Sequence, residues 1–192
     1  MLTIQTRITM TKKRILTTVI IIIAAIAAFA VFSIVSQKQS STEANKVLEA
    51  MEKMIPYLDS EQHLTGMGRE DLAVISVNDV DVVGVIEIPS LDLRAPVAST
   101  GVTREYFATL VEGSPTRGYM RITGDKNDVF SNLADGKPGE RVTFIDVDGI
   151  GYDYTITTQF HLKNWDEADY DLLLTYRTDK DTEFVLGCTA SE

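Results

Sequence analysis

The residues that could do chemistry are few. Cys188 is the only cysteine, and it follows the apolar run at residues 184–187. A cysteine thiolate is a strong nucleophile, so Cys188 at the end of a strand could form a covalent intermediate. It could equally be a buried thiol with no chemical role. A single cysteine cannot form an internal disulfide, and the two histidines, His63 and His161, are too widely spaced to complete a zinc site with it.

Carboxylates form a second group of candidates. Asp125, Asp128 and Glu140 are close in sequence, and calcium prefers hard oxygen ligands of this kind. Their spacing fits no EF-hand loop, so solvated loop carboxylates are the preferred interpretation. We therefore expect neither a metal nor a cofactor.

The charge balance narrows the possible partners. The chain has 28 acidic and 18 basic residues, a formal net charge of −10. The imbalance is larger beyond the N-terminus, because Arg7, Lys12, Lys13 and Arg14 all lie close to the start of the chain. A surface this acidic argues against nucleic-acid binding, which requires positive charge to neutralise phosphates.

Residues 15–35 are apolar and carry no charge, and as a helix they would span roughly 30 Å, about one bilayer core. The basic residues at 12–14 precede them. The positive-inside rule therefore predicts a cytoplasmic N-terminus over residues 1–14, a single-pass helix over 15–35, and an extracellular remainder.

Two alternatives concern this N-terminal part. Residues 28–30, Ala-Phe-Ala, would suit a signal peptidase, although the apolar run continues to Val35 and favours an anchor. Under either interpretation the domain is exported. Translation could start at Met1 or at Met10, which directly precedes the basic cluster.

Residues 36–75 are expected to form a stalk or packing helix and a linker. Apolar residues recur at helical spacing over residues 40–55, and Pro56 ends the pattern. Residues 59–71 are polar with two glycines and read as the linker. We expect His63, which lies in it, to be solvated.

Residues 76–192 are expected to form one mainly β domain. Short runs rich in Val, Ile, Thr, Tyr and Phe alternate with Gly, Pro, Asp and Asn, as in strands and turns. Residues 146–149 lie between two of these runs and are rich in Asp and Gly, which favour turns. Many short strands at close intervals favour a barrel or a sandwich.

Four stretches, in their order, resemble the sortases, the membrane-anchored cysteine transpeptidases of Gram-positive bacteria. GVIEIPSLDLRAPV is similar to the family's first barrel segment with its Ile-Pro. ITGD followed by FSNL resembles the Ala-Gly-His stretch and the Phe-x-x-Leu after it. GERVTFIDVDGIGYDYTI resembles the Gly-Asp-x-Val hairpin, and FVLGCT resembles the strand whose Thr-Cys supplies the nucleophile. The resemblance covers residues 84–189.

The resemblance implies a sortase-like closed β-barrel in which Cys188 is the nucleophile. The family activity is transpeptidation of a sorting signal of the Leu-Pro-x-Thr-Gly kind. The cysteine holds the acyl fragment as a thioester and transfers it to an amine of a cell-wall precursor or a pilin lysine. The implied partners are therefore the sorting-signal peptide, that amine and the membrane.

The sequence departs from the family pattern at two places. Asp125 stands where sortases carry histidine, and the chain ends at Glu192 before a further strand could supply the family's arginine. We therefore expect the last strand to be missing and the strand over residues 183–188 to have an unpaired edge. A shortened gene product, which we prefer, an artificially bounded sequence, or a partner that donates the strand would each explain this.

These departures should impair catalysis. Asp125 would raise the thiol pKa of Cys188, and proton transfer between groups about 4.6 pKa units apart costs roughly 6 kcal/mol. Loss of the arginine removes a further contribution of about 3 kcal/mol. Nothing in the sequence brings His161 to Cys188 as a substitute. The alternative is a catalytically inactive sortase-like surface protein that binds substrates or partners without turnover. A third possibility is an unrelated anchored β-domain in which Cys188 is incidental.

Overall fold

The computed structural model describes residues 41–55, 57–58, 63–66, 68–102, 104, 106–162 and 170–191. The predicted membrane-spanning segment over residues 15–35 lies outside these ranges, as does the predicted cytoplasmic segment over residues 1–14. In the part of the chain that the structure describes, no helix is both long and apolar enough to cross a bilayer.

Residues 41–54 are helical, in agreement with the helix predicted from the apolar spacing. Val47 and Met51 are fully buried on one face of this helix, and Ile55 directly after it is also buried. These side chains pack with residues of the sheet, including Val82 and Val85, in a second hydrophobic cluster. The helix is therefore held on the domain by its apolar face.

The rest of the described chain is mainly β, as predicted. The strands are β1 (Ile75–Val77), β2 (Val80–Ile88), β3 (Leu93–Ala98), β4 (Ala108–Ser114), β5 (Tyr119–Thr123), β6 (Arg141–Asp146), β7 (Gly151–Leu162), β8 (Leu172–Asp179) and β9 (Thr182–Ala190). Three short 3-10 helices lie between them: η1 (Pro89–Leu91), η2 (Pro115–Arg117) and η3 (Leu133–Asp135).

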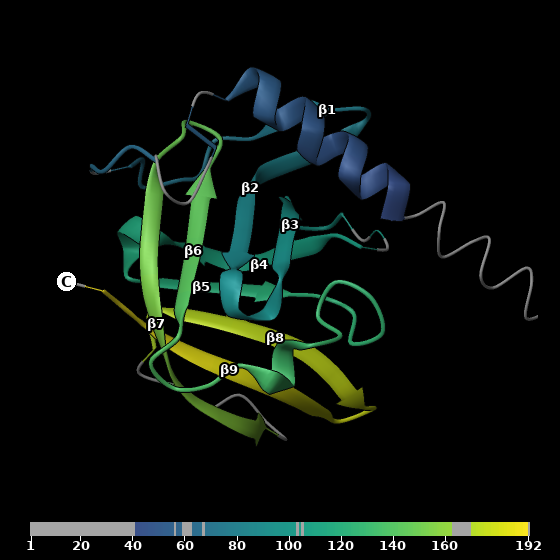
Figure 1. Cartoon of the computed structure of the whole chain (residues 1–192), viewed down its shortest axis with the longest axis vertical. Coiled ribbons are helices and arrows are strands. Elements are labelled where there is room, and N and C mark those ends of the chain that lie inside the picture. The colour runs from purple at the N-terminus through teal and green to yellow at the C-terminus, as the bar shows by residue number, and fades with distance from the viewer. Residues whose placement is uncertain are drawn as a thin grey trace, which may run out of the picture. The chain divides into compact units, whose positions relative to one another are not determined.

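The strands form one sheet in the order β1-β2-β3-β4-β5-β8-β9-β7-β6 (Figure 1). A further pairing joins β2 to β6, so the strand pairings from β2 to β6 make a closed ring. The pairs β3–β4 and β5–β8 are parallel, whereas the other pairings are antiparallel. The parallel pair β5–β8 matters most for the site, because it decides which residues lie beside Asp125.

The prediction that the strand over residues 183–188 has an unpaired edge, with a missing strand beside it, is wrong. This strand is β9, and it pairs antiparallel with β7 on one edge and with β8 on the other. The second partner, β8, is a strand that the sequence patterns did not predict. Because both edges of β9 are hydrogen-bonded, it offers no site for strand donation by a partner.

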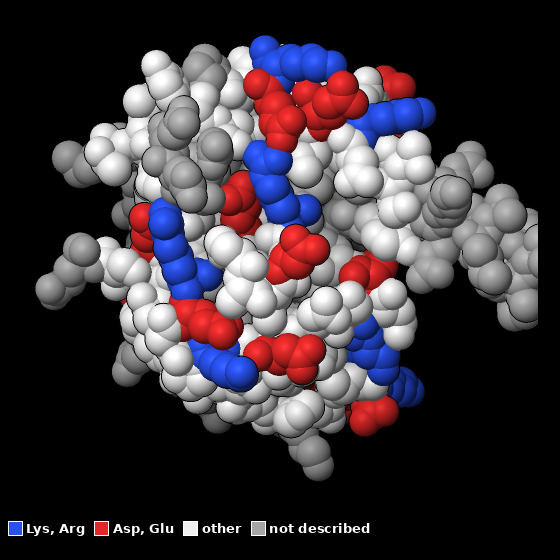
Figure 2. Space-filling model, in the orientation of Figure 1, with Lys and Arg blue, Asp and Glu red and all other residues white. Residues whose placement is uncertain are grey.

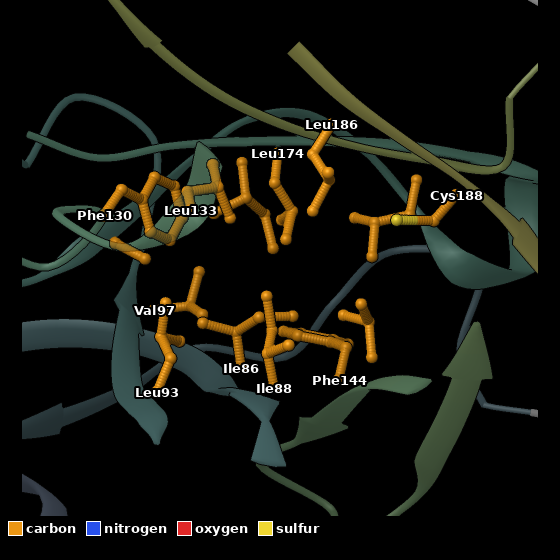
Figure 3. Close-up of a cluster of buried hydrophobic side chains, with 14 of the residues drawn as sticks. Ile86, Ile88, Leu93, Val97, Phe130, Leu133, Phe144, Leu174, Leu186 and Cys188 are labelled. Carbon is orange, nitrogen blue, oxygen red and sulfur yellow. The ribbon is translucent and has the colours of Figure 1, made fainter. Parts of the chain in front are cut away.

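The main hydrophobic core fills the space inside the ring of strands. Figure 3 shows Leu174, Leu186 and Cys188 pointing toward Ile86 and Phe144 across this core. The alternation of strand side chains places odd and even residues on opposite faces. It therefore fixes which residues of β5, β8 and β9 face away from the core.

His63 is not solvated, contrary to the expectation for a linker residue. Leu64 and the turn after β6 exchange two backbone hydrogen bonds, Leu64 N–H to the Gly149 carbonyl and Gly151 N–H to the Leu64 carbonyl, each 3.0 Å. These bonds hold the His63 side chain against the domain, where it is 9% exposed and its Nε2 lies 3.7 Å from Asp153 Oδ2. The hydrogen bonds that hold the segment at His63 and Leu64 to the start of β7 could not be predicted from the sequence.

Candidate functional site

Cys188 lies in the hydrophobic core. Its Cα partners are Ile156 on β7 and Leu172 on β8, and its side chain has no exposed surface. Burial raises the pKa of the Cys188 thiol to about 12. Since the thiolate is the nucleophilic form, Cys188 in the folded domain is a small apolar core residue near neutral pH.

Asp125 lies in the exposed loop that follows β5. Its Oδ1 accepts hydrogen bonds from the backbone N–H of Asn127 at 2.7 Å and from Asn127 Nδ2 at 3.0 Å. The Phe130 N–H donates to the Asp125 carbonyl at 2.9 Å, which folds the loop back. At Gly124, a Cβ would lie 2.6 Å from atoms of Val129 and Phe130, so this position requires glycine.

The structure does not bring Asp125 and Cys188 together. Cys188 is level with Leu172 on β8 and Met120 on β5, whereas Thr123 is three residues further along β5. Three residues of a strand correspond to about 10 Å, and Asp125 lies beyond Thr123. In addition, Cys188 points into the core while Asp125 is exposed.

The strand that runs parallel beside β5 and ends near Asp125 is β8. Thr175 is the Cα partner of Thr123, and the Gly124 N–H donates to the Thr175 carbonyl at 3.0 Å. Tyr176 and Arg177 follow. The end of β8, the strand beside Asp125, therefore contains no cysteine. The sequence patterns did not predict these residues, because they did not predict β8.

Neither of the residues that follow Thr175 is an activated nucleophile. The Tyr176 ring stacks on Phe184 with ring centroids 4.8 Å apart. Burial raises the pKa of the Tyr176 hydroxyl, and the carboxylate of Asp135 adds to the shift. Arg177 is the Cα partner of Glu183 on β9. The end of β8 thus carries an aromatic ring and charged side chains.

A pocket of about 240 Å³ opens beside the end of β5. It is lined by Arg104, Phe107, Thr109, Thr123, Gly124, Asp125 and Asp128. Asp128 is held in place because its Oδ2 accepts the Tyr106 N–H at 3.1 Å. The pocket is smaller than the roughly 300–1,000 Å³ typical of small-molecule sites, so its size suits one side chain or a short piece of peptide.

The three carboxylates considered for calcium do not converge. Asp125 bonds Asn127 and Asp128 bonds the Tyr106 N–H, while Glu140 accepts the Ser90 hydroxyl at 2.7 Å. Within the described ranges, no group of three His, Cys, Asp or Glu side chains could hold a metal ion. The face in Figure 2 shows Lys and Arg interspersed with Asp and Glu. It thus presents no continuous basic patch.

Comparison with solved structures identifies the fold. Sortase A from Corynebacterium diphtheriae is similar with a TM-score of 0.51 and 14% identity, covering 83% of this chain and 92% of that chain. Sortase A from Listeria monocytogenes has a TM-score of 0.49 and 20% identity, covering 58% and 88%. A Clostridium perfringens sortase D5 transpeptidase has a TM-score of 0.49 and 16% identity, covering 58% and 80%.

No family model and no curated protein matches the sequence. The described domain has a sortase-like fold, as the resemblance predicted.

Proposed function

We propose that this chain is a sortase-like surface protein that binds a peptide or protein partner without turning it over. The observation that supports this most directly is the position of Cys188, the only cysteine of the sequence, inside the core and away from Asp125. Cysteine transpeptidation needs an accessible thiolate beside a proton donor. Cys188 meets neither requirement.

The raised pKa of the Cys188 thiol shows how strongly burial opposes formation of the nucleophilic thiolate. With the thiol pKa raised to about 12, the thiolate is a very small fraction of the protein near pH 7. Even that thiolate would lie under core side chains, out of reach of a peptide carbonyl. Binding at the surface, by contrast, needs no change in the core.

We also propose that residues 15–35 anchor the chain in the membrane and that the domain is displayed outside the cell. The uncharged run and the basic residues before it support this arrangement. Protease treatment of intact cells tests it. Cleavage within residues 41–191 supports display, and protection on intact cells but not in lysates contradicts it.

The Cys188 thiol of the native protein should react with a thiol reagent at pH 8 at least about 100-fold more slowly than the thiol of the unfolded chain. Both burial and the raised pKa suppress the reactive thiolate. The measurement is the rate of reagent release with and without denaturant. Equal rates in the two states would show that Cys188 is accessible and would contradict the proposal.

A sorting-signal peptide of the Leu-Pro-x-Thr-Gly kind is the first partner to test. We expect it to bind without cleavage, and mass spectrometry should detect no acyl adduct on Cys188. Cys188→Ala should leave peptide affinity within about twofold, because the side chain is in the core and not at the surface. A thioester on Cys188, or cleavage that Cys188→Ala abolishes, would establish the family activity instead.

A further inference from the structure

The face of β5, β8 and β9 opposite the main core carries charged, polar and apolar side chains. Met120 on β5, Leu174 on β8 and Leu186 on β9 belong to the main core. Because side chains alternate along a strand, their neighbours lie on the opposite face. The residues on this second face are Arg121, Thr123, Leu173, Thr175, Glu183 and Val185. Leu173, Thr175 and Val185 are buried, whereas Arg121 and Glu183 keep some exposed surface.

An ion pair crosses this face. Arg121 Nη2 lies 2.8 Å from Glu183 Oε2, and the two side chains are only 14% and 22% exposed. Arg121 is level with Leu173, whereas Glu183 is level with Arg177. Since β8 lies between β5 and β9, the pair spans β8 at the level of Thr175, midway between Leu173 and Arg177.

Thr175 beneath this pair is an unusual residue. It is fully buried, and its hydroxyl has no hydrogen-bond partner among the residues that the structure describes. The neighbouring Thr123 hydroxyl is used, because it donates to the Thr175 carbonyl at 3.1 Å. A buried hydroxyl without a partner is unfavourable unless a ligand can satisfy it. The Thr175 hydroxyl is therefore a buried donor on the strand that the Arg121–Glu183 pair crosses.

We propose that this face is a carboxylate-binding site that Glu183 closes as an internal ligand. The carboxylate of a partner peptide replaces that of Glu183 on Arg121 and accepts a hydrogen bond from the Thr175 hydroxyl, and Glu183 turns to solvent. Guanidinium groups bind carboxylates with strong, charge-assisted hydrogen bonds. The proposal rests on the proposed function, because it names the chemical class of the partner that is bound without turnover.

The neighbouring pocket limits the partner further. Thr123 lines both this face and the 240 Å³ pocket that contains Asp125 and Asp128. Arg104 also lines the pocket but is paired with Glu43. The two carboxylates would therefore repel a second anionic group. The structure therefore favours a peptide with a single carboxylate at its end and uncharged residues before it.

Internal competition makes the site weak in the wild-type chain. Glu183 is held next to Arg121 by the fold, so it competes at a high effective concentration. Neutralising Glu183 should expose the site. Glu112 offers a matched control, because its Oε1 lies 3.9 Å from Arg121 Nη1 and its side chain is 55% exposed.

The test is an NMR titration of the full chain in detergent with N-acetylglycine, which carries a carboxylate, and with N-acetylglycinamide, which does not. Glu183→Gln should bind N-acetylglycine at least about tenfold more tightly than wild type, with shifts at Thr175. Glu112→Gln should stay within about twofold of wild type. N-acetylglycinamide should not bind, and Arg121→Gln added to Glu183→Gln should abolish N-acetylglycine binding.

Equal affinities of Glu183→Gln and Glu112→Gln for N-acetylglycine would overturn the proposal, as would equal binding of the carboxylate and the amide. Neither result would affect the proposed function, which the Cys188 experiments test separately. Conversely, a thioester on Cys188 would refute the proposed function while leaving the carboxylate titration interpretable.

Discussion

Gly84→Ala is expected to destabilise the domain by about 3 kcal/mol, at the upper end of the usual cost of overpacking. A Cβ at this position would lie 2.3 Å from the Ile145 carbonyl oxygen and 2.8 Å from the Phe144 ring. Gly84 on β2 is the Cα partner of Asp146 on β6. The clash therefore acts on the pairing that closes the ring of strands, where backbone cannot move aside without breaking that pairing.

The measurement is urea unfolding followed by circular dichroism. Gly66→Ala provides the matched control, because nothing lies within 4 Å of a Cβ built there, and surface changes of this kind usually stay within about 0.5 kcal/mol. A loss of under 1 kcal/mol in Gly84→Ala would mean that β2 and β6 are not held at the separation described.

The hairpin of β6 and β7 shows what the sequence could predict. In the sequence, Val142 and Phe144 alternate with the polar residues Arg141 and Thr143, and both apolar residues are fully buried. The turn expected at residues 146–149 forms because Asp146 Oδ1 accepts the N–H groups of Asp148 and Ile150, each at 2.9 Å. The hydrophobic periodicity of a strand and the residue types that favour a turn are local properties. They can therefore be predicted from residues that are close in the sequence.

Strand β8 shows why other parts of the fold could not be predicted from the sequence. Leu172 and Leu174 face the core, but Leu173 and Thr175 are also buried, on the other face. The alternation that marks a half-buried strand is therefore absent, and a short apolar run cannot be assigned by periodicity alone. Without β8, residues 183–188 appeared to be the strand beside Asp125.

The expected site depended on the same error. The sequence predicts Cys188 as the nucleophile because it is the only thiol and because FVLGCT ends like the family's strand. Which strands lie side by side depends on contacts between distant parts of the chain. The parallel pairing of β5 with β8 and the antiparallel return of β9 carry Cys188 to the opposite end from Asp125.

Arg94→Leu is expected to cost about 3 kcal/mol, because it leaves the buried carboxylate of Glu87 without its partner, although the Arg94 side chain itself is 34% exposed. Arg94 Nε lies 2.5 Å from Glu87 Oε1, and the Glu87 side chain is only 8% exposed. Arg94 also pairs with Glu52 in the helix over residues 41–54 and donates to the Leu58 carbonyl at 2.6 Å. The Arg94 side chain, on β3, thus links β2, the helix and the segment at Leu58 that follows the helix.

The exposed pair of Arg104 with Glu43 is the matched control, since it also joins a surface arginine to the same helix. These side chains are 39% and 47% exposed, so Arg104→Leu should cost no more than about 1 kcal/mol. Adding Glu87→Gln to Arg94→Leu should recover part of the loss, because it removes the unpaired charge. If Arg94→Leu and Arg104→Leu unfold at the same urea concentration, burial of Glu87 does not determine how much the Arg94 ion pair stabilises the domain. The helix would then be held mainly by its apolar face, which includes Val47 and Met51.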